Sequence, residues 1–139
     1  MRSALIVLSA VCAVALASCE KGSSSNSDYP YVYLNECITK NFNSGPVGLC
    51  FDKVLSDSRC PMDVVCIWQG TAIAEFTFTE NGNNHPLTLG LKSFPKIHFS
   101  SDTTVAGYKV EFVNLYPYPR SGAPPPPNKI HAEVKITKL

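Results

Sequence analysis

The sequence predicts an all-β fold: a small antiparallel β-sandwich or barrel of about six to eight strands, stapled by disulfides. Apolar and polar residues alternate with a period of two in several segments, which is typical of half-buried strands. Beyond residue 28 no segment shows the 3.6-residue period of an amphipathic helix. Turn signals rich in glycine, asparagine and proline separate the alternating segments, which favours antiparallel neighbours.

The first residues are expected to lie outside this fold. One basic residue, Arg2, precedes an apolar run over residues 4–16. At ~1.5 Å per residue the run is too short to cross a ~30 Å hydrocarbon core, and it is typical of a secretory signal. The sequence LASC at residues 16–19 resembles the lipobox of bacterial lipoproteins. That resemblance implies a lipoprotein signal peptide over residues 1–18 and a diacylated Cys19 that anchors the protein in a membrane.

The residues after the anchor indicate where the protein resides and how the chain is divided. Glu20 is not the aspartate associated with inner-membrane retention in enterobacterial lipoproteins, so the resemblance favours the outer membrane of the cell envelope. Residues 19–28 are rich in glycine, serine and asparagine, and they predict a flexible tether. Residues 29–139 are then expected to form a single β domain of a common size.

The charge balance excludes several classes of partner. Lys and Arg together number 12, and Asp and Glu number 11. Loss of Arg2 with the signal peptide leaves the mature chain formally balanced. Because no basic stripe is present to hold phosphates, we expect no nucleic-acid partner and no binding to anionic lipid surfaces. The membrane contact is expected to pass through the lipid at Cys19 alone.

Six cysteines are present; one lies in the signal peptide and one is the expected lipid anchor. The remaining even number in an exported chain predicts two disulfides, with three possible connectivities. We favour Cys60–Cys66, whose short loop begins with Pro61, and Cys37–Cys50, which flank the turn NSGPVG. In the chain-entropy model each bridge stabilises the fold by ~2 to 3 kcal/mol.

Two strands and a hairpin are expected in the middle of the chain. Residues 47–55 form the first alternating segment. Its expected apolar face consists of Val47, Leu49, Phe51 and Leu55. Residues 66–78 predict a long half-buried strand that starts at the second cysteine of the short loop. Asn81-Gly82 follows, a strong signal for a tight hairpin because both positions tolerate positive φ. The return strand is expected to bury Leu87, Leu89 and Leu91.

Two further strands are expected near the C-terminus. In residues 108–115 the apolar side switches, which predicts a bulge near Val113 and Asn114 and places Val113 on the apolar face with Leu115. Residues 130–137 alternate again. Between these strands the prolines 124–127 cannot donate to a ladder, so we expect a stiff loop.

The stretch DSRCPMDVVCIWQG at residues 57–70 concentrates unusual residues. If its second half is a strand, Trp68 points to the same side as Cys66 and its indole packs over the disulfide. Gly70 then makes room for the ring, as in the tryptophan-on-cystine arrangement of immunoglobulin cores. Pro61 keeps the preceding cysteine extended.

The first three residues of that stretch allow two interpretations. In the structural one, Asp57 and Ser58 accept backbone N–H bonds, and Arg59 pairs with a carboxylate or caps carbonyl groups. In the alternative, all three face solvent and hold a polar ligand or carry out chemistry. No histidine lies nearby in the sequence to activate Ser58 as a nucleophile.

The same stretch resembles a widespread group of small uncharacterised exported bacterial proteins. The resemblance rests on DSRCPMDVVCIWQGTA, preceded by CFDKVL and followed by GYKVEFVNLYPYP, and it spans roughly residues 47–138. The group's signature is DSRCP with CxWxG and a late PYP motif. The resemblance implies an exported β domain and no particular activity. Cys37 and Cys50 lie outside the signature, which favours disulfide pairing within each set.

Tyrosines on proline-bearing segments are the expected contact surface. The segments DYPYVY at residues 28–33 and LYPYPR at residues 115–120 carry them. Such rings suit contact with a protein or a glycan, since they lose little entropy on binding. The candidate binding residues are Tyr116, Tyr118, Arg120, Asp57 and Arg59. The open alternative is that the rings cap the two ends of the sandwich.

The function expected from these features is that of a lipid-anchored envelope binding module. One rival is an inhibitor of exported proteases, which would insert residues 60–66 or 117–128 into a partner's cleft. The other rival is an envelope enzyme, although the sequence offers no activated nucleophile or acid–base pair. His85, His98 and His131 lack metal-ligand spacing, and no phosphate-binding glycine loop is present. We therefore expect no metal and no cofactor.

Overall fold

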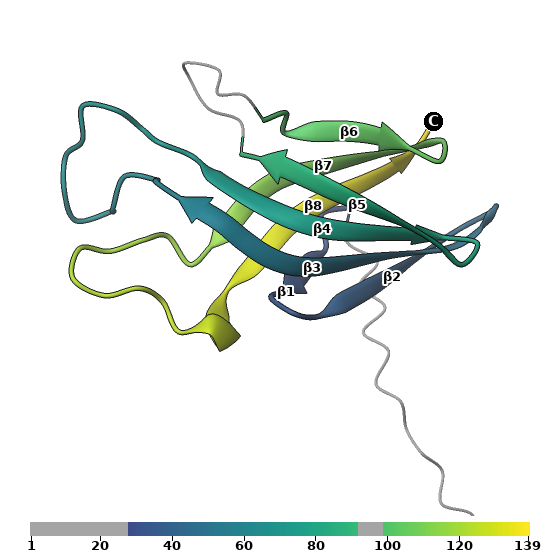
Figure 1. The fold of residues 1–139 in the computed structure, drawn as a ribbon, viewed down its shortest axis with the longest axis horizontal. Coiled ribbons are helices and arrows are strands. Elements are labelled where there is room, and N and C mark those ends of the chain that lie inside the picture. The colour runs from purple at the N-terminus through teal and green to yellow at the C-terminus, as the bar shows by residue number, and fades with distance from the viewer. Residues whose placement is uncertain (1–27, 92–98) are drawn as a thin grey trace, which may run out of the picture.

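Two four-stranded antiparallel sheets pack face to face in the computed structural model, which describes residues 28–91 and 99–139 (Figure 1). The strands of the first sheet, in spatial order, are β1 (Tyr31–Tyr33), β8 (His131–Lys138), β7 (Tyr108–Tyr116) and β6 (Asp102–Val105). Those of the second are β2 (Cys37–Phe42), β3 (Gly45–Asp57), β4 (Ala72–Glu80) and β5 (Asn83–Gly90). The predicted all-β, disulfide-stapled fold is confirmed, and of the two predicted alternatives, sandwich and barrel, the structure has the sandwich.

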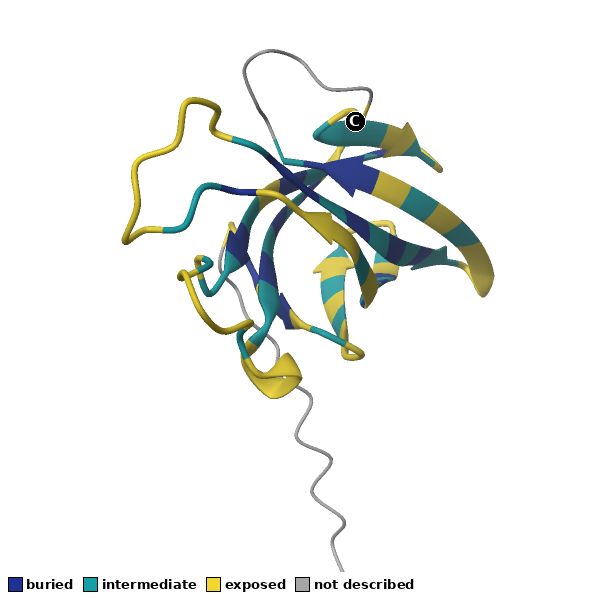
Figure 2. Ribbon diagram, turned by 60° about the vertical axis from the view of Figure 1, so that its left-hand side comes forward, coloured by how far each residue is buried: buried dark blue, intermediate teal, exposed yellow. Residues whose placement is uncertain are grey.

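The core forms from alternate residues of both sheets, which are buried where their neighbours along the strand are more exposed (Figure 2). In β4 the inward positions are Ala72, Ala74, Phe76 and Phe78, the alternation that the sequence predicts for this segment. Phe76 stacks on Phe51 of β3 with ring centroids 5.1 Å apart. It also meets Phe112 of β7 edge-on at 5.2 Å, so aromatic contacts join the two sheets.

Tight turns connect three pairs of neighbouring strands. Asn81 and Gly82 have φ of 49° and 78° and join β4 to β5, which confirms the predicted hairpin. Ala106 and Gly107, with φ of 49° and 78°, join β6 to β7 in the same way. The positive φ at both central positions matches the right-handed twist of the flanking strands. Gly45, with φ of 120°, starts β3 after the turn from β2.

Two residues that were expected to point into the core are exposed, because each of them lies in a β-bulge. The register between β7 and β8 shifts between Phe112 and Asn114, which confirms the predicted bulge. Val113 is the unpaired residue of that bulge and is exposed, so its expected place on the apolar face is wrong. Leu55 is likewise the unpaired residue of a bulge in β3 and is exposed. In both cases the extra residue reverses the alternation of the strand.

Both disulfides have the favoured connectivity. Cys37 and Cys50 are directly paired residues of β2 and β3, and their sulfur atoms are bonded. Cys60 and Cys66 close a short loop between β3 and β4. The first bridge therefore fastens an edge strand to its sheet, and the second shapes a loop outside both sheets.

Helical structure in the described part of the chain amounts to the single 3₁₀ turn η1 (Pro127–Lys129). That part of the chain contains no helix long and apolar enough to span a membrane. The expected signal peptide, most of the tether, the lipidation site Cys19 and His98 lie outside the described residues.

The aromatic contacts predict a large loss of stability for Phe76→Ala. The ring is buried between both sheets, and its removal leaves a cavity that rigid neighbouring strands cannot fill. We expect the free energy of unfolding to fall by about 3 to 5 kcal/mol, measured by urea denaturation. Leu139→Ala, at an exposed terminal side chain, is the control. Equal unfolding midpoints for the two variants would contradict the packing described.

Candidate functional site

Residues 58–71, which we call the stapled loop, connect β3 to β4 and project from one end of the sandwich (Figures 1 and 2). The expected strand from Cys66 to Ala72 is wrong, because β4 begins only at Ala72. Trp68 is 71% exposed, so its indole does not occupy the interior position expected of it. The disulfide pulls the chain back toward Cys60, and residues 66–71 therefore cannot continue straight out of β4.

Gly70 is required for a reason other than the expected one. Its φ is +63°, and a Cβ built on it would lie 1.8 Å from the carbonyl oxygen of Ser58. No side chain fits at that distance. The glycine therefore allows the two arms of the stapled loop to approach each other, and the expected role of making room for the indole ring is wrong.

Hydrogen bonds hold the two arms together at the base of the stapled loop. The Ser58 amide donates to the Thr71 carbonyl at 2.8 Å, and the Cys60 amide donates to the Gln69 carbonyl at 3.0 Å. The Ser58 hydroxyl accepts from the Thr71 amide at 3.1 Å and donates to the Thr71 carbonyl at 3.0 Å. The Ser58 side chain is thus engaged with backbone groups, as the structural interpretation expects.

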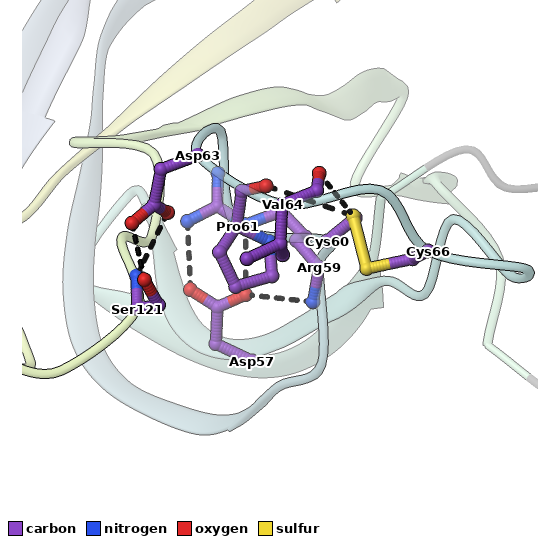
Figure 3. The surroundings of a disulfide bond; sticks show 8 residues. All are labelled: Asp57, Arg59, Cys60, Pro61, Asp63, Val64, Cys66 and Ser121. Carbon is purple, nitrogen blue, oxygen red and sulfur yellow. Dashed lines mark hydrogen bonds and ion pairs between the residues drawn. A yellow bond between two sulfur atoms is a disulfide. The ribbon is translucent and has the colours of Figure 1, made fainter.

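Arg59 is buried, with 8% of its surface exposed, and its guanidinium is engaged on several sides (Figure 3). Its Nε and Nη2 atoms donate to the two carboxylate oxygens of Asp57 at 2.8 and 2.7 Å. It also donates to the carbonyls of Leu115 and Pro117. The solvent-facing alternative is therefore wrong for Arg59. The residue ties β3 and the stapled loop to the chain that follows β7.

A second set of contacts links the stapled loop to residues 117–126, which we call the proline loop. The Met62 amide donates to the Pro119 carbonyl at 3.1 Å. Asp63 accepts hydrogen bonds from the amide of Ser121 at 2.9 Å and from its hydroxyl (Figure 3). These two bonds lower the pKa of the Asp63 carboxyl below its ordinary value. The two loops, distant in sequence, therefore form one connected surface.

Aromatic side chains gather beside these loops, on the outer side of the β1–β8–β7 sheet. We call this group the tyrosine face; its members are Tyr31, Tyr33, Tyr116, Tyr118 and His131. Val32, Leu115 and Ala132 alternate with them and are buried, so the rings point away from the core. Tyr31, Tyr33 and Tyr116 lie on one side of one sheet, so the alternative in which the tyrosines cap both ends of the sandwich is wrong for these three.

The rings of the tyrosine face contact one another. His131 stacks on Tyr116 at 5.3 Å, and it lies 5.3 Å from Tyr31 and 4.9 Å from Tyr33. Tyr31 meets Tyr116 edge-on at 6.1 Å, and Tyr116 meets Tyr118 edge-on at 6.1 Å. The Tyr118 ring lies 4.8 Å from the guanidinium of Arg59, which joins the face to the stapled loop.

Tyr116 lies at the centre of this arrangement. Its hydroxyl accepts from the Asn114 amide group at 3.0 Å and faces a carboxylate oxygen of Glu133 at 3.5 Å. Burial raises the pKa of the Tyr116 phenol, and the Glu133 carboxylate raises it further. The phenol is therefore a neutral hydrogen-bonding group at physiological pH.

A cavity of about 190 Å³ lies where the proline loop meets the sandwich. Its lining residues are Val54, Asp57, Arg59, Leu115, Tyr116, Pro117, Pro124, Pro125 and Ile130. The walls are mostly apolar, and the volume is below the ~300 Å³ at which typical small-molecule sites begin. The cavity is therefore suited to a single apolar side chain or a group of similar size.

The structure brings four of the five candidate binding residues together. These four lie at the start of the proline loop: Asp57, Arg59 and Tyr116 line the cavity there, and the Tyr118 ring lies against the Arg59 guanidinium. Arg120 lies farther along that loop, exposed, where its charge also lowers the pKa of Asp63. In residues 28–91 and 99–139, no three His, Cys, Asp or Glu side chains are grouped as metal ligands.

Sequence reasoning missed two features of the site. The sequence analysis considers His131 only as a metal ligand, whereas its register opposite Tyr33 places it within the tyrosine face. Ile67 falls within the strand predicted over residues 66–78, and no role is predicted for Val65; both side chains are exposed in the stapled loop. The signal that could have identified both residues was the short spacing of Cys60 and Cys66, which closes a loop around Val65 and ends one residue before Ile67.

No family model, curated protein or solved structure matches the chain. The resemblance to the exported group with the DSRCP and CxWxG signature therefore stays a prediction. The class that the structure defines is a disulfide-stapled antiparallel β-sandwich with two joined loops at one end and an aromatic face beside them on the outer side of one sheet.

The burial of Arg59 predicts that Arg59→Leu is strongly destabilising. The substitution removes the guanidinium donors to the Asp57 carboxylate and to two backbone carbonyls, and it leaves the carboxylate with the backbone amide of residue 59 alone, which we expect to cost about 3 kcal/mol in urea denaturation. Arg120→Leu removes the same charge at an exposed position and should change stability by less than about 0.5 kcal/mol. Similar losses for both variants would show that the Arg59 contacts are not structural.

The lowered pKa of Asp63 predicts a pH-dependent contact between the two loops. A depressed carboxyl pKa stabilises the folded contact above its ordinary value of 3.8, and this stabilisation is lost as pH falls through the lowered folded value. We expect the Ser121 amide resonance to titrate with a midpoint below 3.8 in an NMR experiment, and not to show this titration in Asp63→Asn. A midpoint at or above 3.8 in the unmodified chain would refute the hydrogen-bonded carboxylate.

Proposed function

We propose that the protein is a lipid-anchored binding module of the bacterial cell envelope that recognises a protein partner through its tyrosine face. The observation that carries this proposal is the gathering of five rings from β1, β7, β8 and the start of the proline loop. Three of these rings, Tyr31, Tyr33 and Tyr118, are exposed. Rings brought together on the outside of a sheet contribute little to the core, but they supply a ready contact area.

The arrangement of the rings suits binding. Each ring of the face contacts at least one other, so the side chains are held in place before a partner arrives. Prior ordering lowers the entropy cost of association. Tyrosine also combines a large apolar area with a hydroxyl that can form hydrogen bonds at an interface.

A protein partner fits this surface better than a glycan. Tyr31 lies at 78° to Tyr116 and at 89° to His131, and Tyr118 lies at 72° to Tyr116. Rings packed edge-on in this way do not form a coplanar array on which successive sugar rings could lie. Tyr, Trp, Met and Arg are enriched in protein interfaces, and exposed Trp68 and Met62 lie in the adjoining stapled loop.

The proposed envelope location has support from the disulfides. Two bridges persist in an oxidising compartment, and they are rare in reduced cytoplasm. Together with the lipobox-like sequence that ends at Cys19, they favour an exported, membrane-tethered protein. A partner is then to be sought among exported and envelope proteins.

The test removes two rings while preserving strand propensity. In the full chain, Tyr31→Thr with Tyr33→Thr should reduce cross-linking to its envelope partner at least about tenfold, because the exposed contact area is lost. Leu139→Ser, at an exposed site in the C-terminal tail, should leave cross-linking unchanged. Recovery is measured by quantitative mass spectrometry of envelope fractions, and the melting temperature of each variant is recorded.

Two results would contradict the proposal. The first is equal recovery of every cross-linked protein with the unmodified chain and the tyrosine variant. The second is ring-dependent co-sedimentation with isolated envelope polysaccharide and no protein adduct, which would assign the face to a glycan.

A further inference from the structure

We propose that residues 62–68 form a preformed apolar plug that inserts into a hydrophobic cleft of a protein partner. This inference rests on the proposed function in one respect, since it assumes that the partner is a protein. It adds a second contact element, distinct from the tyrosine face, and specifies the kind of surface that the partner must offer.

The exposure of these residues is the first support. Of thirteen large hydrophobic side chains exposed in the described part of the chain, five lie within this short segment. They are Met62, Val64, Val65, Ile67 and Trp68. Val65 and Ile67 have relative exposures of 102% and 93%, so they make almost no contact with the domain. Single exposed apolar residues are ordinary on monomers, whereas a contiguous group marks an interaction site.

The rigidity of the segment is the second support. The Cys60–Cys66 disulfide closes it, and the hydrogen bonds of Ser58 and Cys60 hold its base. Met62 and Asp63 fasten its first half to the proline loop (Figure 3). A segment fixed before binding loses little entropy when it enters a cleft of complementary shape.

The charges around the plug favour a protein over a bilayer. Residues 60–71 contain no lysine or arginine, and their one charged side chain is the carboxylate of Asp63; the single cation of the adjoining proline loop, Arg120, acts on that carboxylate. Elements that insert into membranes use basic residues to meet anionic headgroups, and a carboxylate beside the tip opposes that approach. A fixed loop shape also gives no advantage in a fluid bilayer, because lipid chains adapt to any shape. A protein cleft of complementary shape, in contrast, binds a fixed loop more tightly than a flexible one.

The surroundings of the plug have the composition of an interface. The apolar tip adjoins the hydrogen-bonded pair Asp63 and Ser121, and Tyr118 lies against Arg59 at its base. Protein interfaces have an apolar centre bordered by polar groups, and their strongest contacts are often tryptophan or tyrosine. The plug and the tyrosine face are therefore two parts of one continuous contact region.

The first experiment places a photo-reactive benzophenone amino acid at Val65 of the full, membrane-anchored chain in the bacterium that makes it. The control carries the same group at Thr104, an exposed position of β6. We expect one discrete adduct with a protein at Val65, identified by mass spectrometry and absent at Thr104. Adducts with lipid alone, with a second copy of this chain, or no adduct beyond the Thr104 control would overturn the inference.

The second experiment measures the contact with the partner so identified. Ile67→Ser with Trp68→Ser should weaken its binding to the full chain at least about tenfold, with an unchanged melting temperature because both side chains are exposed. Cys60→Ser with Cys66→Ser should also weaken binding, since the segment loses its fixed shape.

The variants distinguish this inference from the proposed function. If the tyrosine variant loses the partner and the Ile67/Trp68 variant binds normally, the plug is refuted and the tyrosine face stands as the contact. If the Ile67/Trp68 variant loses the partner and the tyrosine variant binds normally, the plug stands and the proposed role of the tyrosine face is refuted. Normal binding by both variants refutes both.

Discussion

The ion pair between the buried Arg59 and the partly exposed Asp57 is the interaction on which the candidate contact region depends. One guanidinium joins the end of β3, the base of the stapled loop and the chain leaving β7, because its planar group carries five donors in fixed directions. A buried charge is tolerated only when such partners are in place. The geometry of this pair therefore sets the positions of both loops. The Tyr118 ring stacks against the guanidinium of Arg59.

The apolar side chains outside the core are excluded from it by backbone geometry rather than by their chemistry. Tyr31 and Tyr33 flank the buried Val32, and strand alternation directs them to the outer side of the sheet. The 62–68 segment is excluded for a different reason. A disulfide between residues only six apart turns the chain back on itself before it can reach the interior. Both surfaces are thus presented by rigid elements, a property that lowers the cost of binding.

Local chemistry predicted much of the fold. Asn81-Gly82 determines its hairpin because few other dipeptides accept positive φ at both positions, and the alternation in residues 72–78 follows from the two-residue period of a strand. The expected burial of Val113 and Leu55 is wrong. Which residue of a bulge stays unpaired depends on the register with the partner strand, and the sequence of one strand does not contain that register. Trp68 was misplaced because the apolar pattern around it fits a strand as well as a closed loop.

The sequence by itself predicted an all-β antiparallel fold, favoured two disulfide pairs among three connectivities, and determined the residue types of the contact region, since these depend on short-range patterns and on cysteine spacing. The choice between sandwich and barrel belonged to the tertiary structure, because it depends on which strands pair. Tertiary structure alone decided that Tyr31, Tyr116 and His131 meet on one side of a sheet, because strand order rather than sequence distance makes them neighbours. It also decided that Ile67 and Trp68 face outward. A side chain is buried only where another element covers it, and no element of the described chain covers that loop tip.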